Sequence, residues 1–164
     1  MAWYSRTCST ASWSGGTSRG ALLRYQKRFA GLVAGRRGWY HADPLFAQFS
    51  MLKVGDLYRQ QLRVHAWRFW HGHLPENQAA MLRRVGDVHS HATRSAGAGI
   101  HVATLDHASV GYRVPREWAA LSDEQRGAGS LAAFKRRSRG GFLWKYGVFV
   151  CGAQGCGVCG GVPV

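Results

Sequence analysis

The sequence of 164 residues contains 22 Lys and Arg residues but 8 Asp and Glu residues, which gives a net charge of +14. A positive field of this size concentrates polyanions near the surface, so nucleic acid is the first expected partner and an anionic membrane the second. No stretch of roughly 18 apolar residues occurs, and the N-terminus lacks the apolar segment of a signal peptide. We therefore expect neither a transmembrane nor an exported protein, but an intracellular one in the nucleus or cytoplasm, with its four cysteines as free thiols.

The N-terminal part changes character near residue 13. Residues 1–12 are rich in Ser and Thr and are expected to be disordered or extended. A helix that Gly35 can end is expected to follow. Its predicted apolar face consists of Leu22, Tyr25, Phe29, Leu32 and Val33. Lys27 and Arg28 lie on the same helix, either as a solvated basic edge or as contacts to phosphate.

The strongest helical pattern begins at Val54. Apolar and aromatic residues recur at helical spacing as far as Phe69, which predicts an amphipathic helix of about 17 residues with Gly72 as its left-handed cap. The opposite face carries Arg59, Arg63 and Arg68. A shorter helix is expected just before it, because Asp43 and Pro44 read as an N-cap and a first-turn proline. The rest of the chain is expected to pack against the long helix.

The following segment alternates short elements and loops. A short helix is expected to place Met81 and Leu82 inward, and residues 86–99 are expected to form a polar loop. Residues 100–105 alternate weakly and are compatible with a short strand or an extended segment. Ser122 opens a capping-box pattern that can begin a helix.

The last predicted helix is capped by Ser130 and places Leu131 and Phe134 toward the core. A basic cluster occupies its remaining surface and consists of Lys135, Arg136, Arg137 and Arg139. Phe142, Leu143 and Trp144 can extend this helix, although the glycines at 140–141 favour a break. Residues 147–164 are rich in glycine and are expected to form a disordered tail.

Several short motifs occur in a fixed order. They are Trp13–Thr17 before Gln26-Lys27-Arg28; His41-x-Asp43-Pro44-Leu45-Phe46 with Leu52-Lys53-x-x-Asp56-Leu57-Tyr58 and Leu74-Pro75; His89-Ser90-x-x-Thr93-Arg94-Ser95; Ser109, Tyr112, Pro115, Trp118 and Leu121; and Ser130-Leu131-x-x-Phe134-Lys135. In this order they resemble the region beyond the thumb in reverse transcriptases of non-LTR (LINE-type, jockey-like) retrotransposons. Ala119, Ser122 and Ser138 depart from the family pattern, which has Asn, Pro and an apolar residue there. The polar residue at 138 implies weaker packing after Phe134.

The resemblance implies a mainly α fold, a small irregular helical domain with long loops over residues 13–146. It also implies a role in holding template RNA and target DNA near the polymerase. Catalysis by this chain alone is not expected, because two-metal polymerisation needs clustered carboxylates and the sequence has no Asp-Asp pair. It also lacks a Walker-type loop, a nucleophile elbow and an HExxH helix.

No metal ion or cofactor is expected. Cys151, Cys156 and Cys159 approach metal-ligand spacing, but no His or Cys follows them as a fourth ligand. Two His-x-His pairs, at 71–73 and 89–91, lie in predicted loops without carboxylates at ligand spacing.

The resulting hypothesis is a C-terminal fragment of a retrotransposon RNA-directed DNA polymerase that binds RNA or DNA through Lys and Arg contacts to phosphate. The candidate residues are Lys27, Arg28, Arg94, Lys135, Arg136, Arg137 and Arg139. Arg94 can alternatively brace its own loop. Expected partners are nucleic acid and the missing palm and thumb, with no membrane. Two alternatives stay open: a free-standing basic nucleic-acid-binding protein, and a structural remnant that exposes Tyr58, Trp67, Phe69 and Trp118 and aggregates.

Overall fold

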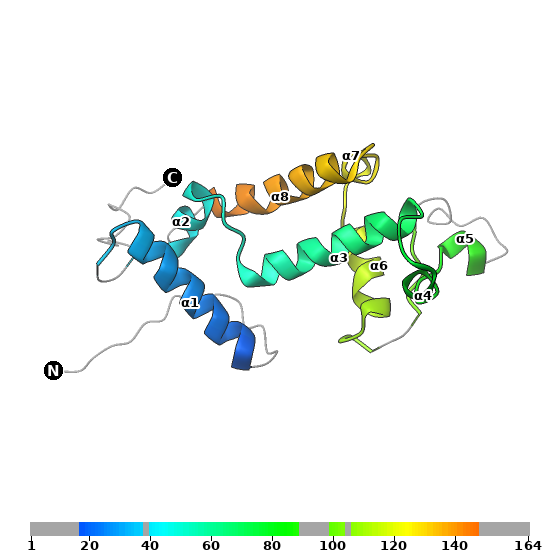
Figure 1. The fold of residues 1–164 in the computed structure, drawn as a ribbon, viewed down its shortest axis with the longest axis horizontal. Coiled ribbons are helices and arrows are strands. Elements are labelled where there is room, and N and C mark those ends of the chain that lie inside the picture. Colours follow the sequence, from blue (N-terminus) through cyan, green and yellow to red (C-terminus); the bar gives the residue numbers. More distant parts are fainter. Residues whose placement is uncertain (1–16, 38–39, 89–98, 104–105, 148–164) are drawn as a thin grey trace.

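The structure is a computed structural model, which describes residues 17–37, 40–88, 99–103 and 106–147. Within these ranges the chain forms eight helices and no strand, so the mainly α fold expected from the sequence is confirmed. The helices are α1 (Thr17–Val33), α2 (Ala42–Gln48), α3 (Val54–Trp70), α4 (Glu76–Ala79), α5 (Val85–Val88), α6 (Val110–Ala119), α7 (Asp123–Arg126) and α8 (Leu131–Gly147) (Figure 1). Among the described helices, none has the length and apolar character needed to span a membrane.

The central element is α3. Figure 1 shows it along the long axis of the molecule, with α8 running antiparallel to it and α6 crossing it on the other side. Both helices contact α3, while α2 packs on α8, and α1 packs on α2 and α3. The expectation that the rest of the chain packs against this helix therefore holds for α1, α6 and α8, whereas α2 and α7 pack on α8.

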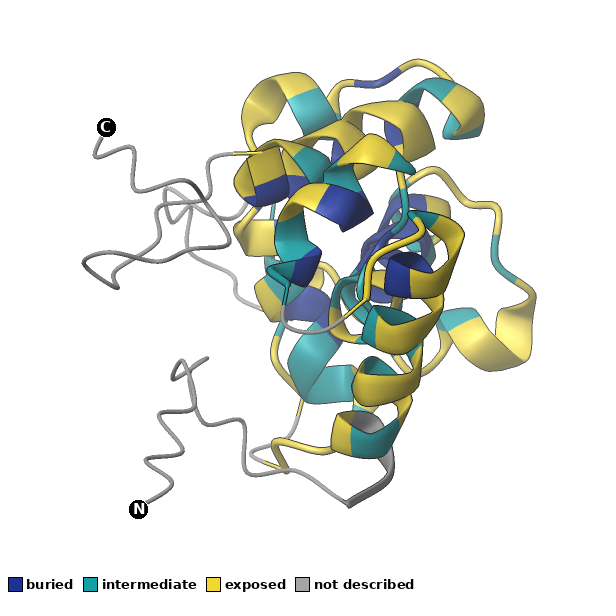
Figure 2. Ribbon diagram, turned by 90° about the vertical axis from the view of Figure 1, so that its left-hand side faces the viewer, coloured by how far each residue is buried: buried dark blue, intermediate teal, exposed yellow. Residues whose placement is uncertain are grey.

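Two hydrophobic clusters hold the helices together, and their buried residues lie on the inner sides of the ribbons (Figure 2). The larger cluster joins α3, α6 and α8 through residues that include Trp67, Trp118 and Phe134. The smaller cluster joins α2 to the end of α8 through Phe46 and Tyr146. Because α3 lies between α6 and α8, residues on several of its sides are buried.

The sequence correctly predicts where α3 begins and ends, but it does not predict which of its side chains are buried. His73 N donates to Arg68 O at 2.7 Å and Gly72 has φ 70°, which confirms the left-handed cap. Arg63, which the pattern assigns to the polar face, is buried at 7% exposure. The start of α2 also differs, since His41 occupies the N-cap position and Asp43 lies in the first turn. The Asp43 carboxylate instead accepts a hydrogen bond from Lys53 Nζ at 2.7 Å.

Helix α8 is continuous, so the expected break at residues 140–141 is wrong. Its buried residues recur at every fourth position and are Phe134, Ser138, Phe142 and Tyr146, each at most 4% exposed. The expected weakening of packing after Phe134 is also wrong, because the last two of these residues join the smaller cluster. Packing across this row outweighs the low helix propensity of two glycines, which costs about 1 kcal/mol each.

Helix α1 turns its predicted apolar face away from the body of the molecule. Leu22, Tyr25, Phe29, Leu32 and Val33 are 49–77% exposed. The helix packs instead through its other side, where Ala30 and Gly31 are buried and Leu23 packs against the smaller cluster. Tyr40 lies against Gly31 and its hydroxyl donates to Lys27 O at 2.9 Å. A Cβ on Gly31 would lie 2.1 Å from the Tyr40 Oη atom, so this contact requires glycine. The predicted helical periodicity of α1 is correct, but the face predicted to pack against the core is wrong.

The segment after α3 differs from the expectation at two points, because α5 covers the first residues of the loop expected at 86–99 and Met81 does not face inward. No strand forms over residues 100–103, the described part of the segment 100–105. Leu82 is buried as expected, whereas Met81 is 59% exposed. Ile100 forms an isolated antiparallel bridge with Arg84.

Two serines begin the helices that follow. Ser109 Oγ accepts from Tyr112 N at 3.2 Å and starts α6, a helix that the sequence analysis did not predict. Ser122 and Gln125 form the predicted capping box at the start of α7.

Several expectations concern residues outside the described ranges. These are the N-terminus at 1–12, the motif at 89–95 with Arg94, the three cysteines near the end and the tail beyond residue 147.

Candidate nucleic-acid interface

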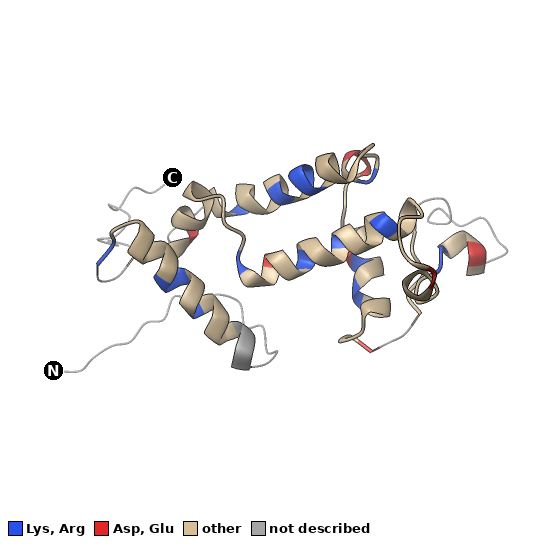
Figure 3. Ribbon diagram, viewed as in Figure 1, with Lys and Arg blue, Asp and Glu red and all other residues tan. Residues whose placement is uncertain are grey.

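The basic cluster on α8 is confirmed as a surface feature. Its residues, Lys135, Arg136, Arg137 and Arg139, are all exposed. The row that begins at Phe134 faces the core at every fourth position, so the cations occupy the other sides of the helix. Figure 3 shows these positive positions in the middle of α8, next to α3. They are held on a rigid element whose opposite side is packed.

A groove of about 670 Å³ runs between α3 and α8. It is lined by Ser50, Leu57, Gln60, Gln61, Val64, Lys135, Arg136, Arg139, Gly140 and Leu143. Cations from α8 form one wall, and amides and apolar side chains of α3 form the other. Such a combination offers positive charge for phosphate, amide groups for hydrogen bonds and apolar surface for bases or sugars. The α3 side chains in this groove were not identified from the sequence, where a pair of adjacent glutamines in a helix is the available signal.

The four cations differ in how they are held. Arg137 donates to the Glu124 carbonyl oxygen at 2.8 Å, and Arg139 donates to the Ser50 carbonyl oxygen. Both acceptors are neutral, so neither guanidinium loses its charge. Lys135 and Arg136 have no ion pair within 4.0 Å among the residues that the structure describes. These two cations are therefore the most available to a polyanion.

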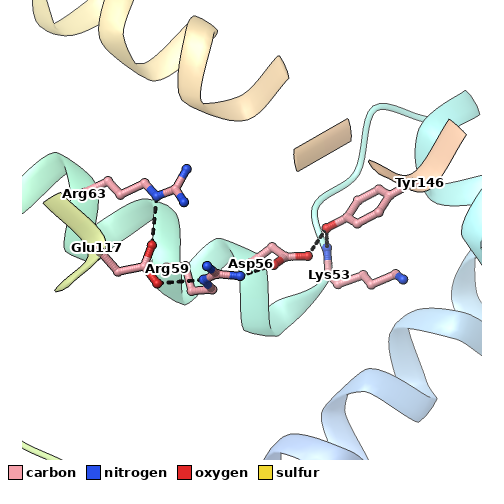
Figure 4. A network of polar contacts seen from close by, with 6 residues as sticks. All are labelled: Lys53, Asp56, Arg59, Arg63, Glu117 and Tyr146. Atoms are coloured by element: carbon pink, nitrogen blue, oxygen red, sulfur yellow. Dashed lines mark hydrogen bonds and ion pairs between the residues drawn. The ribbon is translucent and has the colours of Figure 1, made fainter. Parts of the chain in front are cut away.

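The arginines of α3 are used differently. The carboxylate of Glu117 on α6 accepts hydrogen bonds from Arg59 Nε at 2.7 Å and from Arg63 Nε at 2.9 Å (Figure 4). The Arg63 guanidinium also lies over the Phe142 ring, 4.4 Å from its centroid. The carboxylate thus neutralises charge inside the molecule and joins α3 to α6. These arginines belong to the fold rather than to the basic surface.

A second polar contact joins the end of α8 to the start of α3. Tyr146 on α8 donates a hydrogen bond to Asp56 and accepts one from Lys53 N at 3.2 Å (Figure 4). Burial, together with the hydrogen bond to Asp56, raises the pKa of the Tyr146 hydroxyl well above its ordinary range. The hydroxyl therefore remains a donor at physiological pH and ties α8 to the start of α3.

The remaining candidate cations lie elsewhere. Arg28 on α1 is exposed and Lys27 is half-buried, and neither lines the groove. Arg94 is outside the described ranges. The structure thus brings together the α8 cations with α3, but not with the two candidates on α1.

The described residues contain no group of three or more His, Cys, Asp or Glu side chains that could hold a metal ion. His71 and His73 stack with Trp67, with ring centroids 4.1 and 5.6 Å from the indole. Burial and the nearby His73 and Arg84 lower the pKa of His71. The pair at 89–91 and the cysteines lie outside the described ranges.

Comparison with known proteins gives no match, whether to a family model, to a curated protein or to a solved structure.

Proposed function

We propose that this chain is a nucleic-acid-binding part of a non-LTR retrotransposon reverse transcriptase, the region that lies beyond the thumb. Its ordered motifs resemble that family, and its net charge of +14 suits a polyanionic partner. The observation that carries the proposal is the exposed, unneutralised pair Lys135 and Arg136 on the wall of the groove between α3 and α8.

Binding in this groove would follow the physics of phosphate neutralisation. Lys135 and Arg139 are four residues apart, so they are separated by about 6 Å along the helix axis. Each contact releases a condensed counterion, so affinity falls as salt rises. Contacts of this kind position the strand without selecting its sequence.

The test compares two variants of equal charge. One carries Lys135→Ala with Arg136→Ala in the groove, and the control carries Arg37→Ala with Arg83→Ala, two exposed cations that do not line it. Binding of fluorescent single-stranded RNA and DNA is measured over a range of salt. Loss of two phosphate contacts to a single strand should reduce the salt slope by about 1.4 and the affinity near 0.1 M salt by roughly 25-fold.

The control variant should lose much less affinity, because it removes only long-range charge. Equal losses in the two variants would mean that binding is delocalised over the surface, and the groove would be rejected as the site. Absence of salt-dependent binding by the wild-type chain would overturn the proposed function as a whole.

A second candidate role is structural, as a docking part of the longer polymerase. The exposed apolar face of α1 favours it, because five large side chains with 49–77% exposure form a surface that another part of a polymerase would cover. The remnant hypothesis named other residues: Trp67 and Trp118 are buried, and Tyr58 and Phe69 pack against the core, so that expectation is wrong.

The parent enzyme can be tested in the transcript. Sequencing upstream of the Met1 codon should show an open frame that runs into a palm with an aromatic-Ala-Asp-Asp motif. A stop codon just upstream would exclude the polymerase from this product and leave the free-standing nucleic-acid-binding protein as the alternative.

A further inference from the structure

We propose that a second pocket, formed where α6 crosses α3, binds one nucleotide unit, with the phosphate on arginines and the base on aromatic rings. The α6 pocket has a volume of about 420 Å³ and is lined by Tyr58, Arg59, Leu62, His107, Tyr112, Arg113, Arg116 and Glu117. None of these residues lines the groove between α3 and α8, so this site is separate from the proposed strand-binding surface.

Two arginines supply the positive charge of the α6 pocket. Arg113 donates to the His107 carbonyl oxygen at 2.6 Å and to Tyr58 Oη at 3.3 Å, and Arg116 donates to Tyr112 Oη. These acceptors are neutral, and no described carboxylate forms an ion pair with either guanidinium. Both arginines therefore keep a full charge while their positions are fixed by hydrogen bonds.

The single carboxylate in the pocket does not cancel this charge. Glu117 is bound by Arg59 at 2.7 Å and by Arg63 at 2.9 Å, so it is already neutralised by two guanidiniums. Arg113 and Arg116 are three residues apart on α6 and project to the same side of the helix. Planar guanidiniums placed in this way suit the oxygens of a phosphate, which can accept paired N–H donors.

The aromatic side chains supply a surface for a base. The rings of His107 and Tyr112 lie with centroids 4.2 Å apart, and Arg116 lies over Tyr112 at 5.3 Å. Arg113 lies over the Tyr58 ring at 5.6 Å. His107 and Arg116 are exposed, which leaves the mouth of the pocket open, while Leu62 is buried. Aromatic rings and guanidinium planes are the groups on which unpaired bases stack.

A pocket that combines arginines with aromatic rings favours a ligand that carries both a phosphate and a base. Phosphate alone would use only the arginines, and a nucleoside would use only the rings. The volume lies at the lower end of the range for small-ligand pockets, which fits one nucleotide rather than a longer segment. The unit can be a free mononucleotide or a single nucleotide of a strand, and the two sources are separated by the experiment below.

The experiment measures binding to the full chain by calorimetry, with adenosine 5′-monophosphate, adenosine and inorganic phosphate as probes. The monophosphate should bind more tightly than either part alone. Arg116→Gln should weaken its binding at least tenfold, and Tyr112→Leu should reduce its affinity to that of inorganic phosphate. Arg83→Gln, an exposed arginine outside the pocket, serves as the matched control and should change nothing. Circular dichroism and thermal melting establish that each variant is folded.

The two proposed sites, the α6 pocket and the groove between α3 and α8, can be tested independently of each other. The Lys135→Ala/Arg136→Ala variant should keep its affinity for the mononucleotide, because those residues lie outside the α6 pocket. Weaker binding of a short single-stranded RNA by the Arg116→Gln variant would identify a strand as the source, and unchanged binding would identify the free nucleotide. Affinity for the monophosphate no greater than that for inorganic phosphate, or unaffected by both pocket substitutions, would overturn the proposal.

Discussion

Replacement of Glu117 by Gln tests whether the charge pair between α3 and α6 holds the fold together. The side chain of Glu117 is 15% exposed, and it joins Arg59 at 2.7 Å and Arg63 at 2.9 Å. Glutamine keeps the shape of the side chain but removes its charge. The Arg63 guanidinium, whose side chain is 8% exposed, would then remain buried without a counter-charge.

The expected loss of stability is the sum of two contributions, one from the ion pair with Arg59 and one from the ion pair with Arg63. Arg59 is 33% exposed, so screening limits its pair to about 0.2–1 kcal/mol. Removal of the partner of a buried charge such as Arg63 costs about 3–5 kcal/mol. The total is a large fraction of the 5–15 kcal/mol that typically stabilises a domain. At roughly 2–4 °C per kcal/mol for a chain of this size, Glu117→Gln should lower Tm by about 6–24 °C.

Urea and thermal unfolding, followed by circular dichroism, measure this effect. Asp123→Asn is the control, because Asp123 is 97% exposed in its pair with Arg126 and its loss should lower Tm far less. Arg63→Met removes the buried charge, so the double variant with Glu117→Gln should recover part of the lost stability. If Glu117→Gln melts within a degree of the wild type, or if Arg63→Met gives no recovery, the buried charge does not depend on this carboxylate.

Three further outcomes are expected in the same unfolding assays. Gly140→Ala should raise the free energy of unfolding by about 0.5–1 kcal/mol, because the added Cβ in mid-helix would meet no atom within 4 Å beyond its chain neighbours and the backbone of the helix itself. Gly31→Ala should lower it by about 1–3 kcal/mol by displacing Tyr40, and Gly20→Ala, where space is open, should not. The pKa values of His65 and His71 are lowered by burial first, so the unfolded chain binds more protons. Stability should therefore fall as pH drops below about 6.5, and His65→Gln should flatten that dependence.

The parts of the fold that the sequence predicts well are those set by local chemistry. The length of α3, its glycine cap at Gly72 and the capping box at Ser122 depend on residues close together in the chain. Hydrogen bonds of this kind are formed within one turn, so neighbouring residues suffice to identify them. The exposure of the α8 cations followed in the same way, because Phe134 fixed which side of the helix faces inward.

Most of the errors concern contacts between distant residues, whereas the assignment of Asp43 instead of His41 as the N-cap of α2 is a local error. The sequence pattern places Arg63 on a polar face, and only the position of Glu117, 54 residues later, makes its burial possible. For α1, the periodicity identifies an apolar face but does not say what covers it; Gly31 and Tyr40 determine that the small-residue side packs instead. The α6 pocket was missed for the same reason, since Tyr58 and Arg113 meet across 55 residues.

The separation of structural from available arginines follows from where the carboxylates lie. The chain has 8 acidic residues for 22 basic ones, so there are too few carboxylates to give each cation a partner of its own. Glu117 takes two arginines and Asp43 takes Lys53, all of them on or next to α3. No described carboxylate pairs with Lys135 or Arg136, although packing of the opposite side holds α8 in place. A helix that is held in place by packing and carries unneutralised cations beside a groove suits the proposed phosphate binding, because the ligand would order only the side chains and not the backbone that carries them.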